Sequence, residues 1–196
     1  MEIRIYFEGN KSLRPGFKAF FRSLDEAARK VDSRIECISV NEGVSDYAKA
    51  VKTHPAAWNI LLKDSEEPMP GNPITLCQKL GIKTGLADDV FWMVVMMESW
   101  FLADPGALAD YYGEGFSSKA IGQTQDVEQI KKSEVVQRLS RATKKTAKRE
   151  YDKIRHAPYL LERLNPSRVQ ARALNCRKLF DAVAAKLVTL RLTRTP

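Results

Sequence analysis

The sequence predicts an α/β fold with a mostly parallel, four-stranded sheet flanked by helices and followed by a helical, basic C-terminal region. Strand and helix patterns alternate through residues 1–67, an apolar run follows at 90–97, and basic residues concentrate after residue 131. Such alternation is typical of parallel strands joined by right-handed crossovers. The 196 residues suffice for one large domain or two small ones.

The first half of the chain supplies three of the predicted strands. Apolar side chains alternate along EIRIYFE (2–8), which predicts a strand that ends at Glu8. The spacing of apolar residues and turn signals then predicts a helix at 15–31, a strand at 34–40, a helix at 45–53 capped by Ser45, and a strand at 58–63.

The second half begins with an irregular connection at 68–89, which is rich in Pro, Gly and Asp. The run VFWMVVMM (90–97) predicts a fourth strand, buried on both faces and ending at Glu98. The later helical spacings predict a helix or helix pair at 100–113 and further helices at 127–141, 156–164 and 167–187. We expect an α/β core at 1–113 and a basic helical region at 114–196 that packs on it.

Charge is divided unevenly between these regions. Residues 131–196 hold 18 Lys and Arg against 5 Asp and Glu, whereas residues 1–130 hold 14 against 19. This division is expected if one region attracts a polyanion and the other holds a cation such as a metal ion. A solvated basic helical surface would give the same pattern.

Four acidic residues follow the predicted strands. Glu8 ends the first strand, Asp64 and Glu66 follow the third, and Glu98 follows the fourth. The carboxyl ends of parallel strands meet at one edge of a sheet, so we expect these acids to converge there. Clustered carboxylates need a compensating charge, and a hard cation such as Mg²⁺ or Mn²⁺ prefers oxygen ligands. Helix capping and salt bridges are the alternative roles for these acids.

The segments IYFEG and LLKDSE resemble the Toprim domain, a metal-binding α/β module of topoisomerases, primases and certain nucleases. Together with VVMMESWFLADPGALADYYG and KREYDKIRHAPYLL, they resemble a Toprim-like family of unknown function. Its members are similar to accessory nuclease subunits that accompany ABC-type ATPases in bacterial defence against phage. The resemblance covers most of the chain.

The resemblance implies a role for each acid. Glu8 would be an acid/base or metal-organising carboxylate, Asp64 and Glu66 would be metal ligands, and Glu98 would be a further catalytic acid of the same pocket. Glu66 departs from the usual Asp-x-Asp pattern by one methylene, which leaves its reach open. Gly9 would let a phosphate or metal approach the strand end closely.

The segment 144–155 is the predicted nucleic-acid contact, because its cations would neutralise phosphates of DNA or RNA. Tyr151 and His156 lie among these cations and would stack on a base or touch a phosphate. For His156, a general acid for the leaving oxygen and a structural hydrogen-bonding residue are the alternatives. The predicted contact residues are Lys144, Lys145, Lys148, Arg149, Tyr151, Lys153, Arg155 and His156.

These observations lead to a Mg²⁺- or Mn²⁺-dependent nuclease as the leading hypothesis, acting on DNA or RNA. No P-loop segment GxxxxGK[ST] is present, so ATP hydrolysis would come from an ABC-type ATPase partner. A catalytically inactive binding or regulatory subunit is the first alternative, and primase-like nucleotidyl transfer is the second.

The sequence shows no apolar run long enough to span a bilayer, so we expect a cytoplasmic protein without membrane contact. Assembly into a homo-oligomer stays open.

Overall fold

A single parallel sheet organises the chain. The computed structural model describes residues 1–69 and 73–193. The strands are β1 (Glu2–Glu8), β2 (Arg34–Val40), β3 (Trp58–Asp64) and β4 (Val90–Met93). They lie in the order β2-β1-β3-β4 and every pair is parallel. The predicted fold class is therefore confirmed, and the fold is of the Toprim-like α/β type.

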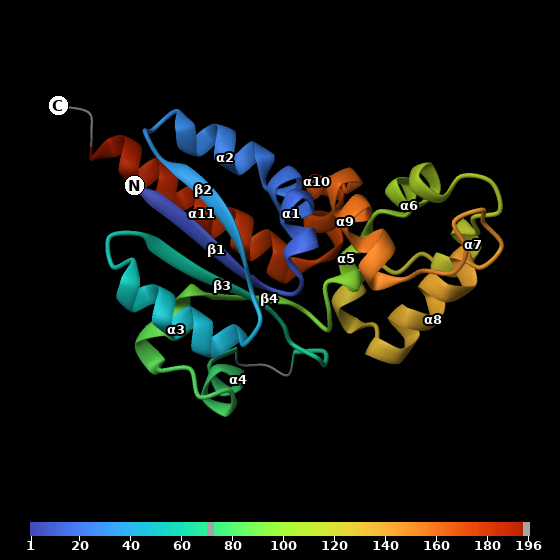
Figure 1. Ribbon diagram of the computed structural model, residues 1–196, viewed down its shortest axis with the longest axis horizontal. Coiled ribbons are helices and arrows are strands. Elements are labelled where there is room, and N and C mark those ends of the chain that lie inside the picture. Colours follow the sequence, from blue (N-terminus) through green and yellow to red (C-terminus); the bar gives the residue numbers. More distant parts are fainter. Residues whose placement is uncertain (70–72, 194–196) are drawn as a thin grey trace.

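Helices cover both faces of this sheet. Figure 1 shows α3 (Gly43–Thr53) on one face, with α1 (Arg14–Phe20), α2 (Arg22–Arg29) and α11 (Leu174–Leu192) on the other. Aromatic contacts attach the helices of the second face to the sheet and to one another. The ring centres of Phe7 and Phe17 are 4.3 Å apart, and those of Phe20 and Trp100 are 5.0 Å apart. Such buried aromatic contacts contribute to the main hydrophobic core.

The remaining helices gather beyond the carboxyl ends of the strands (Figure 1). They are α5 (Glu98–Ala103), α6 (Pro105–Tyr112), α7 (Ser118–Ile121), α8 (Lys132–Thr143), α9 (Lys153–Arg163) and α10 (Pro166–Arg172). Helix α4 (Pro73–Lys79) and 3-10 helices at Lys11–Leu13, Thr84–Asp89 and Val127–Gln129 complete the elements. No described helix is both long and apolar enough to cross a bilayer.

Helix α9 is fixed against α1 by a close backbone approach at Gly16. A Cβ atom on Gly16 would lie 2.6 Å from the Leu161 Cβ and 2.8 Å from the Pro158 carbonyl oxygen. Only glycine permits this approach without a shift of one helix. The contact therefore sets the position of α9, whose first turn reaches the acidic residues.

Several sequence predictions differ from the structure in their boundaries. The helix predicted at 15–31 is two helices that meet at Phe21, where the backbone leaves helical geometry (φ −92°, ψ 11°). The predicted helices at 127–141 and 167–187 are likewise divided, into the 3-10 helix Val127–Gln129 with α8 and into α10 with α11. The predicted irregular connection contains α4 and the 3-10 helix Thr84–Asp89, while its residues 70–72 lie outside the described chain.

Two local predictions are wrong for physical reasons. Ser45 does not cap α3, because the helix already begins at Gly43 and Ser45 lies within its first turn. The fourth strand ends at Met93 rather than at residue 97, since Val95 adopts a left-handed conformation (φ 65°) that breaks strand geometry. The residues after Met93 are nevertheless buried, which explains their apolar sequence.

Candidate functional site

The carboxyl edge of the sheet is shaped by two strained segments, one directly after β3 and one directly after β4. Glu66 and Val95 both have positive φ values, 68° and 65°, and the Glu66 N–H donates to the Val95 carbonyl oxygen at 2.9 Å. The buried Ser65 hydroxyl accepts the Val95 N–H at 2.8 Å and donates to the Glu67 carbonyl oxygen at 2.6 Å. Left-handed conformations are costly for a β-branched residue and are often found where a fold positions functional groups.

Strand alternation divides the four predicted acids, Glu8, Asp64, Glu66 and Glu98, which we call the acidic group. Phe7 and Leu62 are in register, so Asp64, two residues after Leu62, shares the face on which Phe7 contacts α1. Glu8 instead shares the α3 face with Tyr6, whose ring lies 6.2 Å from that of Tyr47. Glu8 and Asp64 therefore lie at the same edge of the sheet but on opposite faces.

Asp64 and Glu98 form the interior of the acidic group. The Met97 N–H donates to Asp64 Oδ1 at 2.8 Å, which places the Asp64 carboxylate at the start of α5, where Glu98 lies. Burial raises the pKa of Asp64 from 3.8 to about 7; Lys153 opposes this shift, while the charges of Glu98 and Glu8 add to it. A carboxyl that titrates near neutral pH can hold or release a proton under physiological conditions.

Glu98 is held by two residues from the C-terminal region. Its side chain is 2% exposed. The Tyr151 hydroxyl donates to Glu98 Oε1 at 3.0 Å, and Lys153 Nζ donates to Oε2 at 3.4 Å. The backbone N–H of Tyr151 donates in turn to the Thr143 hydroxyl at 2.8 Å, which fixes Tyr151 to the end of α8. These contacts join the segment after α8 to the acidic group.

Lysines pair with the other two acids. Lys63 forms an ion pair with Glu8, and Lys132 of α8 forms one with Glu66. The hydrogen bond to Glu66 and the charges of Asp64 and Glu98 raise the pKa of Lys132, so Lys132 also lies within electrostatic reach of the interior pair. Neither Lys63 nor Lys132 stands out in the sequence as a partner of these acids. Alternation along β3 would have placed Lys63 beside Glu8, but no local signal connects Lys132 with Glu66.

The donor chemistry of the acidic group fits a hard divalent cation, because all four side chains offer carboxylate oxygens. Within residues 1–69 and 73–193, however, no three His, Cys, Asp or Glu side chains are arranged to hold a metal ion. Mg²⁺ commonly uses one or two protein carboxylates, with water and substrate phosphates as the other ligands. Asp64 and Glu98 meet that requirement without a third preformed ligand.

The local backbone explains why position 9 is a glycine. Its φ value is 141°, and a Cβ atom there would lie 2.8 Å from Leu13 Cδ1. The backbone conformation therefore favours glycine at this position, and Leu13 would have to shift to admit a larger residue. The close approach of a phosphate or metal, which the family resemblance implies, is not needed to explain it.

The predicted nucleic-acid segment divides into exposed cations and buried anchors. Lys144, Lys145, Lys148, Arg149, Lys153 and Arg155 are exposed. His156 is buried instead: its Nδ1 accepts the Asp152 N–H at 3.0 Å and lies 3.0 Å from the Tyr112 hydroxyl oxygen. The Tyr151 ring packs at 6.0 Å from the Phe101 ring. In this structure the buried His156 holds the start of α9 in place, and the partly buried Tyr151 holds Glu98 through its hydroxyl group.

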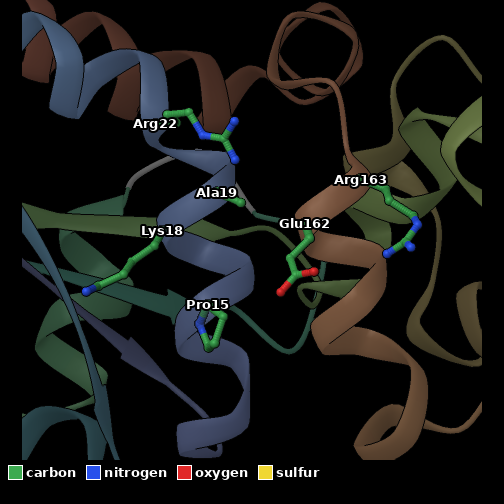
Figure 2. A pocket seen from close by; sticks show the side chains of 6 residues that line it. All are labelled: Pro15, Lys18, Ala19, Arg22, Glu162 and Arg163. Carbon is green, nitrogen blue, oxygen red and sulfur yellow. The ribbon is translucent and has the colours of Figure 1, made fainter.

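The hollow between α1 and α9 does not involve the acidic group. Its lining residues are Pro15, Lys18, Ala19, Arg22, Glu162 and Arg163. Figure 2 shows Glu162 pointing into the gap between the two helices, whereas Lys18 points away from it and Arg163 extends from the far side of α9. Because these cations do not converge, we do not assign an anion site here.

Comparison with known proteins places the chain in a family. Residues 10–184 match the model of a family described as "Domain of unknown function (DUF4276)", so the chain belongs to that family. No curated protein matches the chain by sequence. Among solved structures, the chain is similar to the C-terminal region of the Burkholderia pseudomallei OLD protein, with a TM-score of 0.50 and 16% identity. The match covers 92% of this chain and 98% of that one, and it supports the fold alone.

Proposed function

We propose that this member of the family is a Mg²⁺- or Mn²⁺-dependent nuclease that hydrolyses phosphodiester bonds of DNA or RNA. The observation that carries the proposal is the position of Asp64, whose pKa is raised to about 7, at the start of α5, where the buried Glu98 lies at the carboxyl edge of the sheet. Functional crevices of parallel sheets lie at this edge. The fold similarity to the C-terminal region of the OLD protein agrees with a nuclease-type scaffold.

Each residue of the site has a role in this proposal. Asp64 and Glu98 would hold the cation, with Glu66 as a further ligand when it is released from Lys132. Glu8, on the opposite face of the sheet, would stay paired with Lys63. A bound divalent ion polarises a phosphodiester and activates water. Tyr151 positions Glu98 through its hydroxyl group, and the half-exposed Lys153 offers its ammonium group to a phosphate oxygen.

The exposed cations after α8 would bring the polyanion to this edge. Lys144, Lys145, Lys148 and Arg149 precede Tyr151 directly in the chain, and Tyr151 contacts Glu98. Phosphate neutralisation by such residues gives affinity that is independent of sequence and falls with salt.

We further propose that the chain is the nuclease subunit of a bacterial anti-phage complex with an ABC-type ATPase, which agrees with its lack of a P-loop segment.

A cleavage assay tests the catalytic part of this proposal. The purified chain, alone and together with a candidate ABC-type ATPase partner, is incubated with DNA and with tRNA in Mg²⁺ or Mn²⁺. We expect metal-dependent cleavage that falls at least about 100-fold in Glu98→Gln and in Asp64→Ala. Asp110→Asn removes an exposed carboxylate of α6 and should cleave like the wild type. Absence of cleavage under all conditions, or equal cleavage by Glu98→Gln, would refute the catalytic proposal.

An inactive nucleic-acid-binding or regulatory subunit is the second candidate, and the lysine pairing favours it. Lys63 and Lys132 already compensate Glu8 and Glu66, and Lys153 contacts Glu98. In this case the lysines replace the metal and the acidic group only stabilises the fold. The two candidates differ in whether a divalent ion binds at Asp64.

A further inference from the structure

A pair of tyrosines outside the acidic group forms an accessible aromatic surface. The ring of Tyr111 in α6 lies 6.2 Å from that of Tyr159 in α9, and the two ring planes differ by only 14°. Tyr159 is 53% exposed. Tyr111 is partly buried and packs against the core, which anchors the pair. We call Tyr111 and Tyr159 the tyrosine platform.

Cations surround the tyrosine platform. Lys148 Nζ lies 5.0 Å from the centre of the Tyr111 ring, and the Arg163 guanidinium carbon lies 5.3 Å from it. Arg155, Tyr159 and Arg163 follow one another at four-residue steps, so they share one face of α9. Arg163 extends on the side of α9 away from α1 (Figure 2). The exposed aromatic surface therefore lies within a positively charged region.

We propose that the tyrosine platform binds single-stranded nucleic acid by stacking on its bases while the surrounding cations contact its phosphates. This inference rests on the proposed function, from which it takes the class of substrate. Base stacking on aromatic rings tolerates any sequence, and positive charge beside the rings tracks the backbone. A duplex keeps its base faces stacked internally, so the platform selects single strands or unpaired ends.

The position of the platform suits delivery of a strand to the acidic group. Lys153, which contacts Glu98, and Tyr159 lie on the same helix. They are six positions apart, which corresponds to about 9 Å along the helix axis. A strand that stacks one base on Tyr159 would therefore need to extend by only a few nucleotides to bring a phosphate to Asp64 and Glu98.

Binding without cleavage tests this proposal. Fluorescence anisotropy would follow the full chain binding to labelled single strands of ~12 nucleotides, as DNA and as RNA, and to the matching duplexes. EDTA removes divalent ions, so affinity is measured whether or not the chain is a nuclease. The variants are Tyr159→Leu, which removes the ring, and Tyr159→Phe, which keeps it. Ile154→Ala is the matched control, because Ile154 is an exposed apolar residue on another face of the same helix.

We expect Tyr159→Leu to bind single strands about 5- to 150-fold more weakly, and Tyr159→Phe and Ile154→Ala to bind them within about twofold of the wild type. Duplex affinity should change little in any variant. Equal single-strand affinity of Tyr159→Leu and the wild type would overturn the proposal. This also holds if the variant instead loses binding to a proposed ATPase partner, since the ring would then serve a protein contact.

The outcome is separable from that of the proposed nuclease activity. If the wild type does not cleave nucleic acid but its single-strand binding depends on the Tyr159 ring, the nuclease proposal is overturned and the tyrosine platform is supported. Cleavage with ring-independent binding would do the reverse. A preference for DNA or for RNA in this assay would identify the substrate strand.

Discussion

Asp64→Asn removes a carboxyl group whose charged form is disfavoured by the fold, because burial raises its pKa. Burial raises the pKa of Asp64, with contributions from Glu98 and Glu8, while Lys153 and the Met97 N–H oppose the shift. Asparagine has nearly the same shape and keeps an oxygen that accepts the Met97 hydrogen bond, but it cannot ionise. The substitution therefore isolates the energetic effect of the charge.

The sign of the effect follows from proton linkage. Because the pKa of Asp64 is higher in the folded chain than in the unfolded one, the folded chain binds this proton more tightly. The resulting stability is complete below pH 3.8 and is lost as the pH rises to about 7. A rise from 3.8 to about 7 corresponds to at most roughly 4 kcal/mol. After allowance for partial exposure, about 2 kcal/mol should be lost between about pH 5 and pH 8.

Urea unfolding of the wild type and Asp64→Asn across this pH range, without divalent ions, measures the effect. The unfolding free energy of Asp64→Asn should exceed that of the wild type by an amount that grows by about 2 kcal/mol from about pH 5 to pH 8. Asp110→Asn controls for the loss of one negative charge outside the site. Parallel pH profiles for Asp64→Asn and the wild type would refute the assignment of a strongly raised pKa to Asp64.

Three further predictions concern the residues that position the site. Tyr151→Phe removes the hydrogen bond to Glu98 and should lower the unfolding free energy by about 1.5–3 kcal/mol in urea; an unchanged midpoint would contradict this contact. Burial lowers the pKa of His156 below 6.5, so stability is full above pH 6.5 and lost as the pH falls; His156→Gln should remove part of this acid-side loss in thermal scans. Gly16→Ala should cost about 1–3 kcal/mol through its clash with α9, whereas Gly85→Ala, with no atom within 4 Å, should be nearly neutral; equal melting temperatures would oppose the close approach.

Much of the fold follows from local sequence patterns. The alternation along 2–8 and the apolar runs of the other strands reflect burial on a sheet, and burial is a property that each strand carries in its own sequence. The end of β4 was not predictable in the same way, because the run to Met97 stays buried after Val95 leaves strand geometry. Hydropathy indicates which residues are buried, but it does not indicate their backbone conformation.

The candidate site was predictable in position but not in its pairing. Acids at strand ends come to one edge in any parallel sheet, and Glu8 and Asp64 both end strands at that edge, but strand alternation places them on opposite faces. The partner of Glu66 is Lys132, which lies 66 residues further along the chain, and only the tertiary fold brings them together. The aromatic residues show the same limit. Tyr151 and His156 looked available within a basic segment, yet packing buries His156, partly buries Tyr151 and leaves Tyr159 exposed.

The central claim is that Asp64 and Glu98 bind a divalent ion, and calorimetric titration of Mn²⁺ and Mg²⁺ tests it most directly. At about pH 6, ion binding should displace the proton of Asp64, so the measured heat should vary with the ionisation enthalpy of the buffer. We predict saturable binding by the wild type and Asp110→Asn, and its loss in Asp64→Asn and Glu98→Gln. Absence of binding to the wild type, or equal binding to Asp64→Asn, would contradict the claim.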